Sequence, residues 1–279
     1  MGRVTAVFWG DDAGIAALAA EYADQAGPWP GIAAPPERPI RLILTRDGAR
    51  FDSLTRGRLP EWGAGAAFPA SNSILVRVGG DPRAVQRVLR HELAHLALHE
   101  KVRRVPRWFD EGYAARAAGE WSASDAVAVN WAVLLGRRPT LRELDRQLQS
   151  ASASEATSAY AFSTTAVLLL ERIGGERGLA PLLTTLESTV DFDRALRATH
   201  QLTFGQFEER WHKELRSRYG WMLLAGSLTL FWAVAALILV SLWSRRRLRD
   251  DERRLALDEG WELPEEVWEQ LEGPPNADA

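Results

Sequence analysis

Two histidines and a glutamate with the spacing of a metal site lie within one short, apolar run. The run reads RVLRHELAHLALHE over residues 87–100 and contains His91, Glu92 and His95 in the pattern H-E-x-x-H. On an α-helix, side chains four residues apart stand one above the other, so both imidazoles can reach one cation. Glu92 is rotated by about 100° on such a helix and can reach a water at that cation instead. The spacing predicts a zinc site with a glutamate base.

A helix is predicted here independently of the motif. Asp81 and Pro82 have the types expected of a helix N-cap and first helical residue, and apolar residues then recur at helical spacing. The alternative is an amphipathic helix whose polar side chains only face water. Three of the chain's five histidines fall in this helix, between apolar flanks, and a buried imidazole without a partner is costly. Both facts favour the metal site.

A catalytic zinc usually has three protein ligands, so a third ligand is needed. His99 lies about 12 Å along the helix axis from His91, too far for one small ion, and we expect it at the surface or beside a ligand. Glu111 is the better candidate, because Pro106 can start a second helix that returns antiparallel with an aromatic face. The side chain of its neighbour Asp110 is expected either to be exposed to solvent or to contact one of the metal ligands. The alternative for Glu111 is a surface ion pair with Arg107 or Arg103.

H-E-L-A-H followed by P-R-W-F-D-E-G-Y-A resembles the gluzincin metallopeptidases, in particular the peptidase-MA-like domains. In that group a second helix with the pattern W-x-x-E-G-x-A supplies the glutamate ligand. The resemblance implies one Zn²⁺ per chain, held by His91, His95 and Glu111, with Glu92 as general base. The segments 59–78 and 204–215 are similar to a substrate-edge strand and a closing helix of those domains. Many gluzincins have an aspartate four residues after the glutamate ligand to orient a histidine, whereas this chain has Ala115.

The resemblance also suggests a donor for the tetrahedral oxyanion. Related enzymes use a tyrosine or histidine downstream of the glutamate, and Tyr160 is the candidate here. The alternatives are a tyrosine that only packs, or His200 or His212 in its place; His212 stands among charged residues and is expected to be exposed. Strand 74–79 is predicted to be an edge strand that pairs with an extended peptide substrate. Gly63 and Gly65 before it allow close approach of a substrate backbone, or simply form a turn.

Composition and one apolar segment limit the possible partners, the disulfides and the cellular location of the protein. The chain has 279 residues, a net charge of -3 and no cysteine, so no nucleic-acid partner is indicated, disulfides are excluded, and the oligomeric state is left open. Residues 221–243 carry no charge and are predicted to cross a lipid bilayer. Arginines after residue 244 place the tail in the cytoplasm and the peptidase domain outside it. The first 20 residues contain no adequate signal-peptide core, so we expect either that a signal precedes the given start, which we favour, or that the domain faces the cytoplasm.

The expected fold class is α+β, with a small N-terminal β-sheet and helices, a mostly helical zincin-like C-terminal half and one transmembrane helix. The expected domains are a peptidase domain over 1–219 (sheet-containing over 1–80 and helical over 81–219), the membrane helix 220–244 and a charged tail 245–279. Residues 150–159 are expected to form a loop near the cleft. The first functional hypothesis is a membrane-anchored zinc peptidase, with an endopeptidase favoured. The alternative is a catalytically silent, peptide-binding adaptor of the cell envelope.

Overall fold

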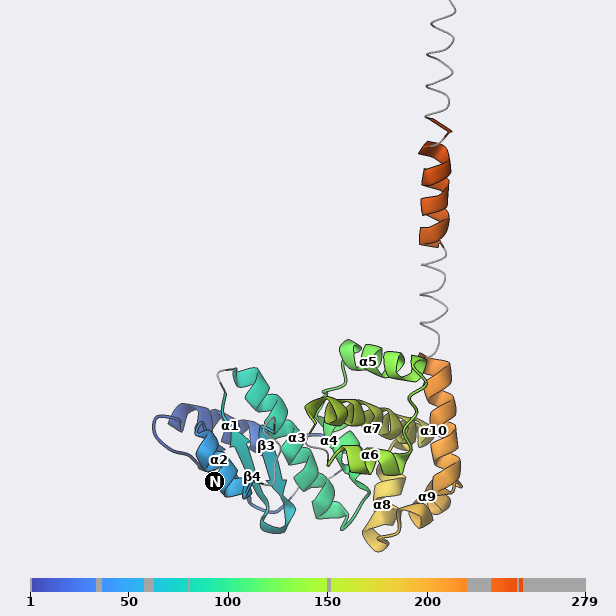
Figure 1. The fold of residues 1–279 in the computed structure, drawn as a ribbon. Helices are drawn as coiled ribbons and strands as arrows, with labels where there is room; N and C mark the ends of the chain where they lie inside the picture. Colours follow the sequence, from blue (N-terminus) through green and yellow to red (C-terminus); the bar gives the residue numbers. More distant parts are fainter. Residues whose placement is uncertain are drawn as a thin grey trace, which may run out of the picture. The chain divides into compact units, whose positions relative to one another are not determined.

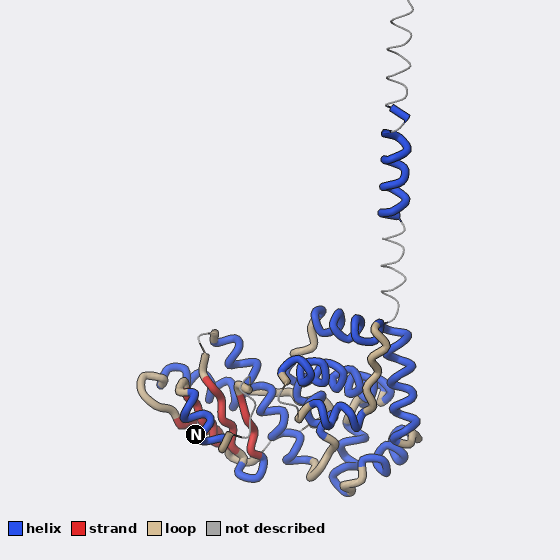
Figure 2. The backbone as a smooth tube through the Cα atoms, viewed as in Figure 1, coloured by secondary structure: helices blue, strands red, loops and turns tan. Residues whose placement is uncertain are grey.

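A computed structural model describes residues 2–33, 37–57, 63–79, 81–149, 152–219, 232–244 and 246–247. The chain divides into two compact units, Met1–Trp221 and Met222–Ala279. All the elements named below belong to the first unit, which is a mostly helical α+β domain with one small sheet (Figures 1 and 2).

The sheet region of the first unit has four strands in the order β1-β2-β4-β3. Strands β1, β2 and β4 are parallel, and β3 runs antiparallel to β4. Helix α1 packs against β1, and α3 lies across β3 and β4. The elements of this region are β1 (Val4–Val7), α1 (Ala13–Gln25), β2 (Ile40–Thr45), α2 (Gly48–Thr55), β3 (Gly65–Phe68), the 3₁₀ turn η1 (Pro69–Ser71), β4 (Ser73–Arg77) and α3 (Pro82–Lys101).

The prediction of an edge strand over 74–79 is wrong. Strand β4 pairs with β2 on one side and β3 on the other, and its residues from Ser73 to Val76 are buried. The edge strands of the described sheet are β1 and β3, and β3, which has only four residues and begins at Gly65, is the one that lines the cleft described below. Its composition, Gly-Ala-Ala-Phe, carries little strand propensity, so its pairing with β4 must define it.

The helical region surrounds α4 (Arg107–Ala118), which packs against α3 on one side and α7 on the other. Aromatic side chains fill the space beneath α4: Trp108 stacks on Phe207 at 5.9 Å between ring centroids, and Phe109 lies 5.2 Å from Phe192. The remaining elements are α5 (Ala123–Leu134), α6 (Leu141–Gln147), α7 (Ala153–Ile173), the 3₁₀ turn η2 (Gly175–Arg177), α8 (Ala180–Ser188), α9 (Phe192–His200) and α10 (Phe204–Tyr219).

The loop expected over 150–159 is mostly helix instead. Ser152 caps α7, its hydroxyl accepting from the Glu155 amide, and the helix continues from Ala153. Alanine has the highest helix propensity, and that outweighs the low complexity of the segment. Residues 150 and 151 lie outside the described residues.

The transmembrane helix expected over 220–244 is contradicted. Within the described ranges, no helix has both the length and the apolar character needed to cross a membrane. Residues 220–231 and 245, and the tail from 248 to 279, lie outside the described residues. The fold class is therefore corrected to a mostly helical α+β domain with a four-stranded sheet, and the predicted bilayer contact through 221–243 is not supported.

Candidate metal centre

Helix α3 begins where the sequence predicted. The Asp81 carboxylate accepts from the backbone amide of Arg83, and Pro82 occupies the first turn. Leu89, Leu93 and Leu96 then face the core. This register turns His91 and His95 away from the sheet and toward α4, with their ring centroids 5.0 Å apart.

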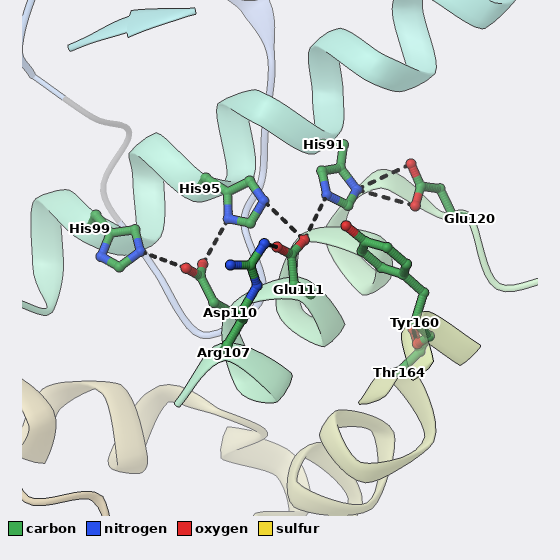
Figure 3. A network of polar contacts seen from close by, with 9 residues as sticks. All are labelled: His91, His95, His99, Arg107, Asp110, Glu111, Glu120, Tyr160 and Thr164. Carbon is green, nitrogen blue, oxygen red and sulfur yellow. Dashed lines mark hydrogen bonds and ion pairs between the residues drawn. The ribbon is translucent and has the colours of Figure 1, made fainter. Parts of the chain in front are cut away.

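The two imidazoles converge on one oxygen of Glu111, as Figure 3 shows. Atoms Nε2 of His91 and Nε2 of His95 each lie 3.5 Å from Glu111 Oε2. One ligand atom from each of the three residues lies within 4.8 Å of the others. Ligands at about 2.0–2.1 Å from a tetrahedral Zn²⁺ are about 3.4 Å apart. Two ring nitrogens and one carboxylate oxygen at this spacing therefore fit zinc.

Two features hold Glu111 in place. The amide of Trp108, in the first turn of α4, donates to Asp145 at 2.7 Å, which fixes the start of the helix. Gly112 then lets α4 lie against α7, because a Cβ atom at this position would lie 2.5 Å from the backbone oxygen of Ser163. The glycine that follows the glutamate in the sequence thus has a packing role: it sets the distance at which α4 presents Glu111 to α3.

A carboxylate lies behind each imidazole. Nδ1 of His91 lies 3.1 and 3.2 Å from the two Glu120 oxygens, and Nδ1 of His95 lies 2.7 Å from Asp110. The second Asp110 oxygen is 2.8 Å from Nε2 of His99. When Nδ1–H donates to a carboxylate, the lone pair on Nε2 is directed at a metal. Asp110 and His99 therefore lie beside the metal ligands. For both residues this was one of the two positions expected from the sequence, and exposure to solvent was the other.

Sequence reasoning missed Glu120. The position at which many gluzincins place an orienting aspartate is Ala115, and the helix ends only three residues later, at Ala118. Gly119 adopts a left-handed conformation (φ 70°) as the C-cap of α4, and this turn carries Glu120 back to His91. The only sequence signal was a glycine followed by an acidic residue at the end of a helix.

The centre is electrostatically negative. Burial opposes protonation of His91, but hydrogen bonds with Glu111 and Glu120 outweigh it and raise its pKa to about 10. The pKa of His95 is also raised, against burial, by Asp110 and Glu111. Burial raises the pKa of Asp110 and of Glu111, yet the adjacent imidazoles hold both well below their usual values. Such a set of groups favours a cation between the imidazoles.

Glu92 lies in the same cleft. Its side chain is buried, and burial raises its pKa. It forms no hydrogen bond or ion pair with any residue in the described part of the chain. Gly65 of β3 makes room for it, because a Cβ atom there would lie 2.6 Å from Glu92 Oε1. The close approach predicted at Gly65 is thus to a side chain of the protein itself.

Tyr160 of α7 also lines the cleft, with its ring 6.3 Å from that of His91 (Figure 3). Burial, and the nearby charge of Glu111, raise the pKa of its phenol, which keeps the hydroxyl protonated. The two alternatives lie elsewhere. His200 contacts Thr199, and His212, which is half-buried rather than exposed, contacts the Pro139 carbonyl.

The groups described above share one cleft of about 900 Å³. Its lining comes from β3 and the residues before it, from α3, from α4 and the turn after it, and from the start of α7 and the residues between it and α6. The lining residues are Gly63, Ala64, Gly65, Ala66, Ala67, Pro69, Val88, His91, Glu92, His95, His99, Val105, Arg107, Asp110, Glu111, Glu120, Leu148, Gln149 and Tyr160.

Comparison with known proteins agrees with this geometry. No curated protein matches the chain significantly. A family model, that of the Peptidase MA superfamily, matches residues 34–217, which is more than half of the chain and includes every residue of the cleft described above. The chain belongs to the Peptidase MA superfamily.

Proposed function

We propose that this chain is a zinc-dependent endopeptidase of the gluzincin type. The observation that carries the proposal is the convergence of both Nε2 atoms on one oxygen of Glu111, at 3.5 Å each, in the cleft that also holds Glu92. In the proposal His91, His95 and Glu111 hold one Zn²⁺. When bound, zinc supplies Lewis-acid chemistry: it polarises a carbonyl group and makes a water molecule acidic.

The proposed role of Glu92 is that of the general base. Its carboxylate is buried and makes no hydrogen bond within the described residues, so its lone pairs are available to a water in the cleft. It takes a proton from the attacking water and passes it to the leaving nitrogen. The proposed role of Tyr160 is to donate its hydroxyl proton, in a hydrogen bond, to the oxyanion that forms on the scissile carbonyl.

The proposed substrate is an extended peptide. Strand β3 is at the edge of the sheet and lines the cleft, so its outer main-chain groups can pair with a peptide backbone. Pairing of this kind engages the middle of a chain and does not need a free terminus, which favours endopeptidase activity.

The test is the Glu92→Gln variant of the purified protein supplied with Zn²⁺. Internally quenched peptides blocked at both ends report hydrolysis, and metal analysis reports zinc. We expect one zinc per chain in wild type and variant alike, and a kcat lower by about 10²–10⁴-fold in the variant. Glu209→Gln, which changes an exposed residue of α10, is the matched control and is expected to hydrolyse normally. If wild type and Glu92→Gln bind peptide equally and neither hydrolyses it, the protein is the silent adaptor.

A further inference from the structure

One arginine lies in a cleft that four carboxylates line. Arg107, the first residue of α4, is the only lysine or arginine among the residues that line the described cleft. The acidic residues that line it are Glu92, Asp110, Glu111 and Glu120. Within the described residues, Arg107 forms an ion pair with the metal centre only through Glu111, and the carboxylates behind the two imidazoles are Glu120 and Asp110.

The described residues do not satisfy the hydrogen-bonding capacity of the Arg107 guanidinium. Its one ion pair is with Glu111 Oε1 at 3.6 Å, which is beyond hydrogen-bond distance, and the side chain remains 46% exposed. Within the part of the chain that the structure describes, its side-chain N–H groups donate no hydrogen bond. Glu111 also faces both imidazoles, so it is not a dedicated partner for the arginine. Figure 3 shows Arg107 beside Glu111.

The position of Arg107 is also electrostatically unfavourable for the helix. The N-terminus of a helix carries a partial positive charge that favours acidic residues and disfavours basic ones. Asp110 meets that preference in the first turn of α4, whereas Arg107 opposes it. A cation at this position, half-exposed and directed into a cleft, is suited to an anionic ligand. A guanidinium binds a carboxylate best, through two parallel hydrogen bonds.

We propose that Arg107 binds a carboxylate of the peptide substrate and so makes the enzyme selective for acidic peptides. This inference rests on the proposed peptidase function. The carboxylate has two possible sources with the same chemistry: an Asp or Glu side chain near the scissile bond, or the C-terminal carboxylate of the peptide.

The experiment uses N-acetylated alanine hexapeptides with the full-length protein and Zn²⁺. One pair differs only by Glu or Gln at an internal position, with both C-termini amidated. A second pair has no acidic side chain and differs only by a free or amidated C-terminus. Cleavage is followed by mass spectrometry in the wild type, and binding is measured in the Glu92→Gln background. The binding arm reports on the carboxylate even when no peptide is hydrolysed.

We expect the acidic member of one pair to be bound and cleaved about tenfold or more better than its neutral partner. The pair that shows the preference identifies the source. In Arg107→Gln we expect the ratio of acidic to neutral peptide, in binding and in cleavage, to fall close to one, with one zinc per chain retained. Arg104→Gln, which removes the same charge from an exposed position before α4 that does not line the cleft, keeps the ratio of the wild type.

Three results would overturn the inference: equal binding within both pairs, a preference that survives Arg107→Gln, or loss of zinc in that variant with equal weakening for all peptides. The last result would mean that Arg107 only supports Glu111. A binding preference without hydrolysis would instead support this inference while refuting the peptidase proposal. Hydrolysis without a preference for the acidic peptide would support the peptidase proposal and refute this inference.

Discussion

Replacing Gly112 by alanine tests whether the contact between α4 and α7 positions the third ligand. A Cβ atom at residue 112 would lie 2.5 Å from the oxygen and 2.7 Å from the carbon of the Ser163 carbonyl. Ordinary contacts begin near 3.4 Å, so the two helices must separate by about 0.9 Å. The atoms that must move belong to backbone and cannot rotate away as a flexible side chain would.

The energetic cost follows from two opposed effects. Overpacking a well-filled interior costs about 1–3 kcal/mol, and a contact with rigid backbone belongs at the upper end. Alanine recovers about 1 kcal/mol of helix propensity relative to glycine. The net loss is about 1–2 kcal/mol, which lowers the Tm by about 2–8 °C for a domain of this size.

The effect on zinc should exceed the effect on folding. Glu111 precedes Gly112, so a shift of α4 moves the carboxylate relative to His91 and His95. Coordination tolerates about 0.2 Å, and we expect zinc affinity to fall by about tenfold or more. Thermal unfolding with a chelator present reports stability alone, and competition with a chromophoric chelator reports the affinity.

A matched variant separates this contact from a general effect of Gly→Ala. Gly14 lies in the first turn of α1, and a Cβ there meets nothing within 4 Å. Gly14→Ala is expected to leave zinc affinity unchanged and to raise stability by about 0.4–1 kcal/mol. If Gly112→Ala also unfolded at the wild-type temperature and bound zinc as tightly, the packing argument for the ligand geometry would be refuted.

Two further variants test the support of the site and of the fold. Glu120→Gln weakens the hydrogen bond that orients His91, and we expect zinc affinity to fall by about 10–100-fold. The control Glu176→Gln, which changes an exposed residue, should not change zinc affinity. Equal affinities in wild type and Glu120→Gln would show that Glu120 does not orient the imidazole. Hydrogen bonds from the Thr140 amide and hydroxyl lower the pKa of Glu143, so its stabilisation is complete above its unfolded pKa of about 4.5 and is lost as the pH falls through the lower folded value. Because the Glu143 side chain is 43% exposed and solvent screens its charge, Glu143→Ala should cost only about 0.5 kcal/mol at pH 7 in chemical denaturation and progressively less as the pH falls below 4. A cost that does not change with pH would contradict the assignment.

The sequence predicted the features of the site that depend on local pattern. The Asp81-Pro82 cap and the histidine spacing defined α3, and Pro106 with the aromatic run defined α4, so the meeting of Glu111 with the two imidazoles followed from helix geometry. The roles of Glu92 and Tyr160 stay predictions, although the structure places both in the cleft.

Two of the features that were missed or wrong depend on tertiary structure. Glu120 reaches His91 through a turn beyond the end of α4, which no periodicity reveals. Strand β3 has little strand propensity of its own and exists through its pairing with β4. The membrane span expected over 221–243 rested on composition alone, and within the described ranges no helix is long and apolar enough to cross a membrane.

The most direct test of the account is zinc binding by the full-length protein, compared between wild type and Glu111→Ala. The account predicts one zinc per chain in the wild type and an affinity at least about 100-fold lower in the variant, because the third ligand is gone. The control Glu209→Gln should bind as the wild type does. Equal zinc stoichiometry and affinity in wild type and Glu111→Ala would contradict the central claim that α3 and α4 together build a metal centre.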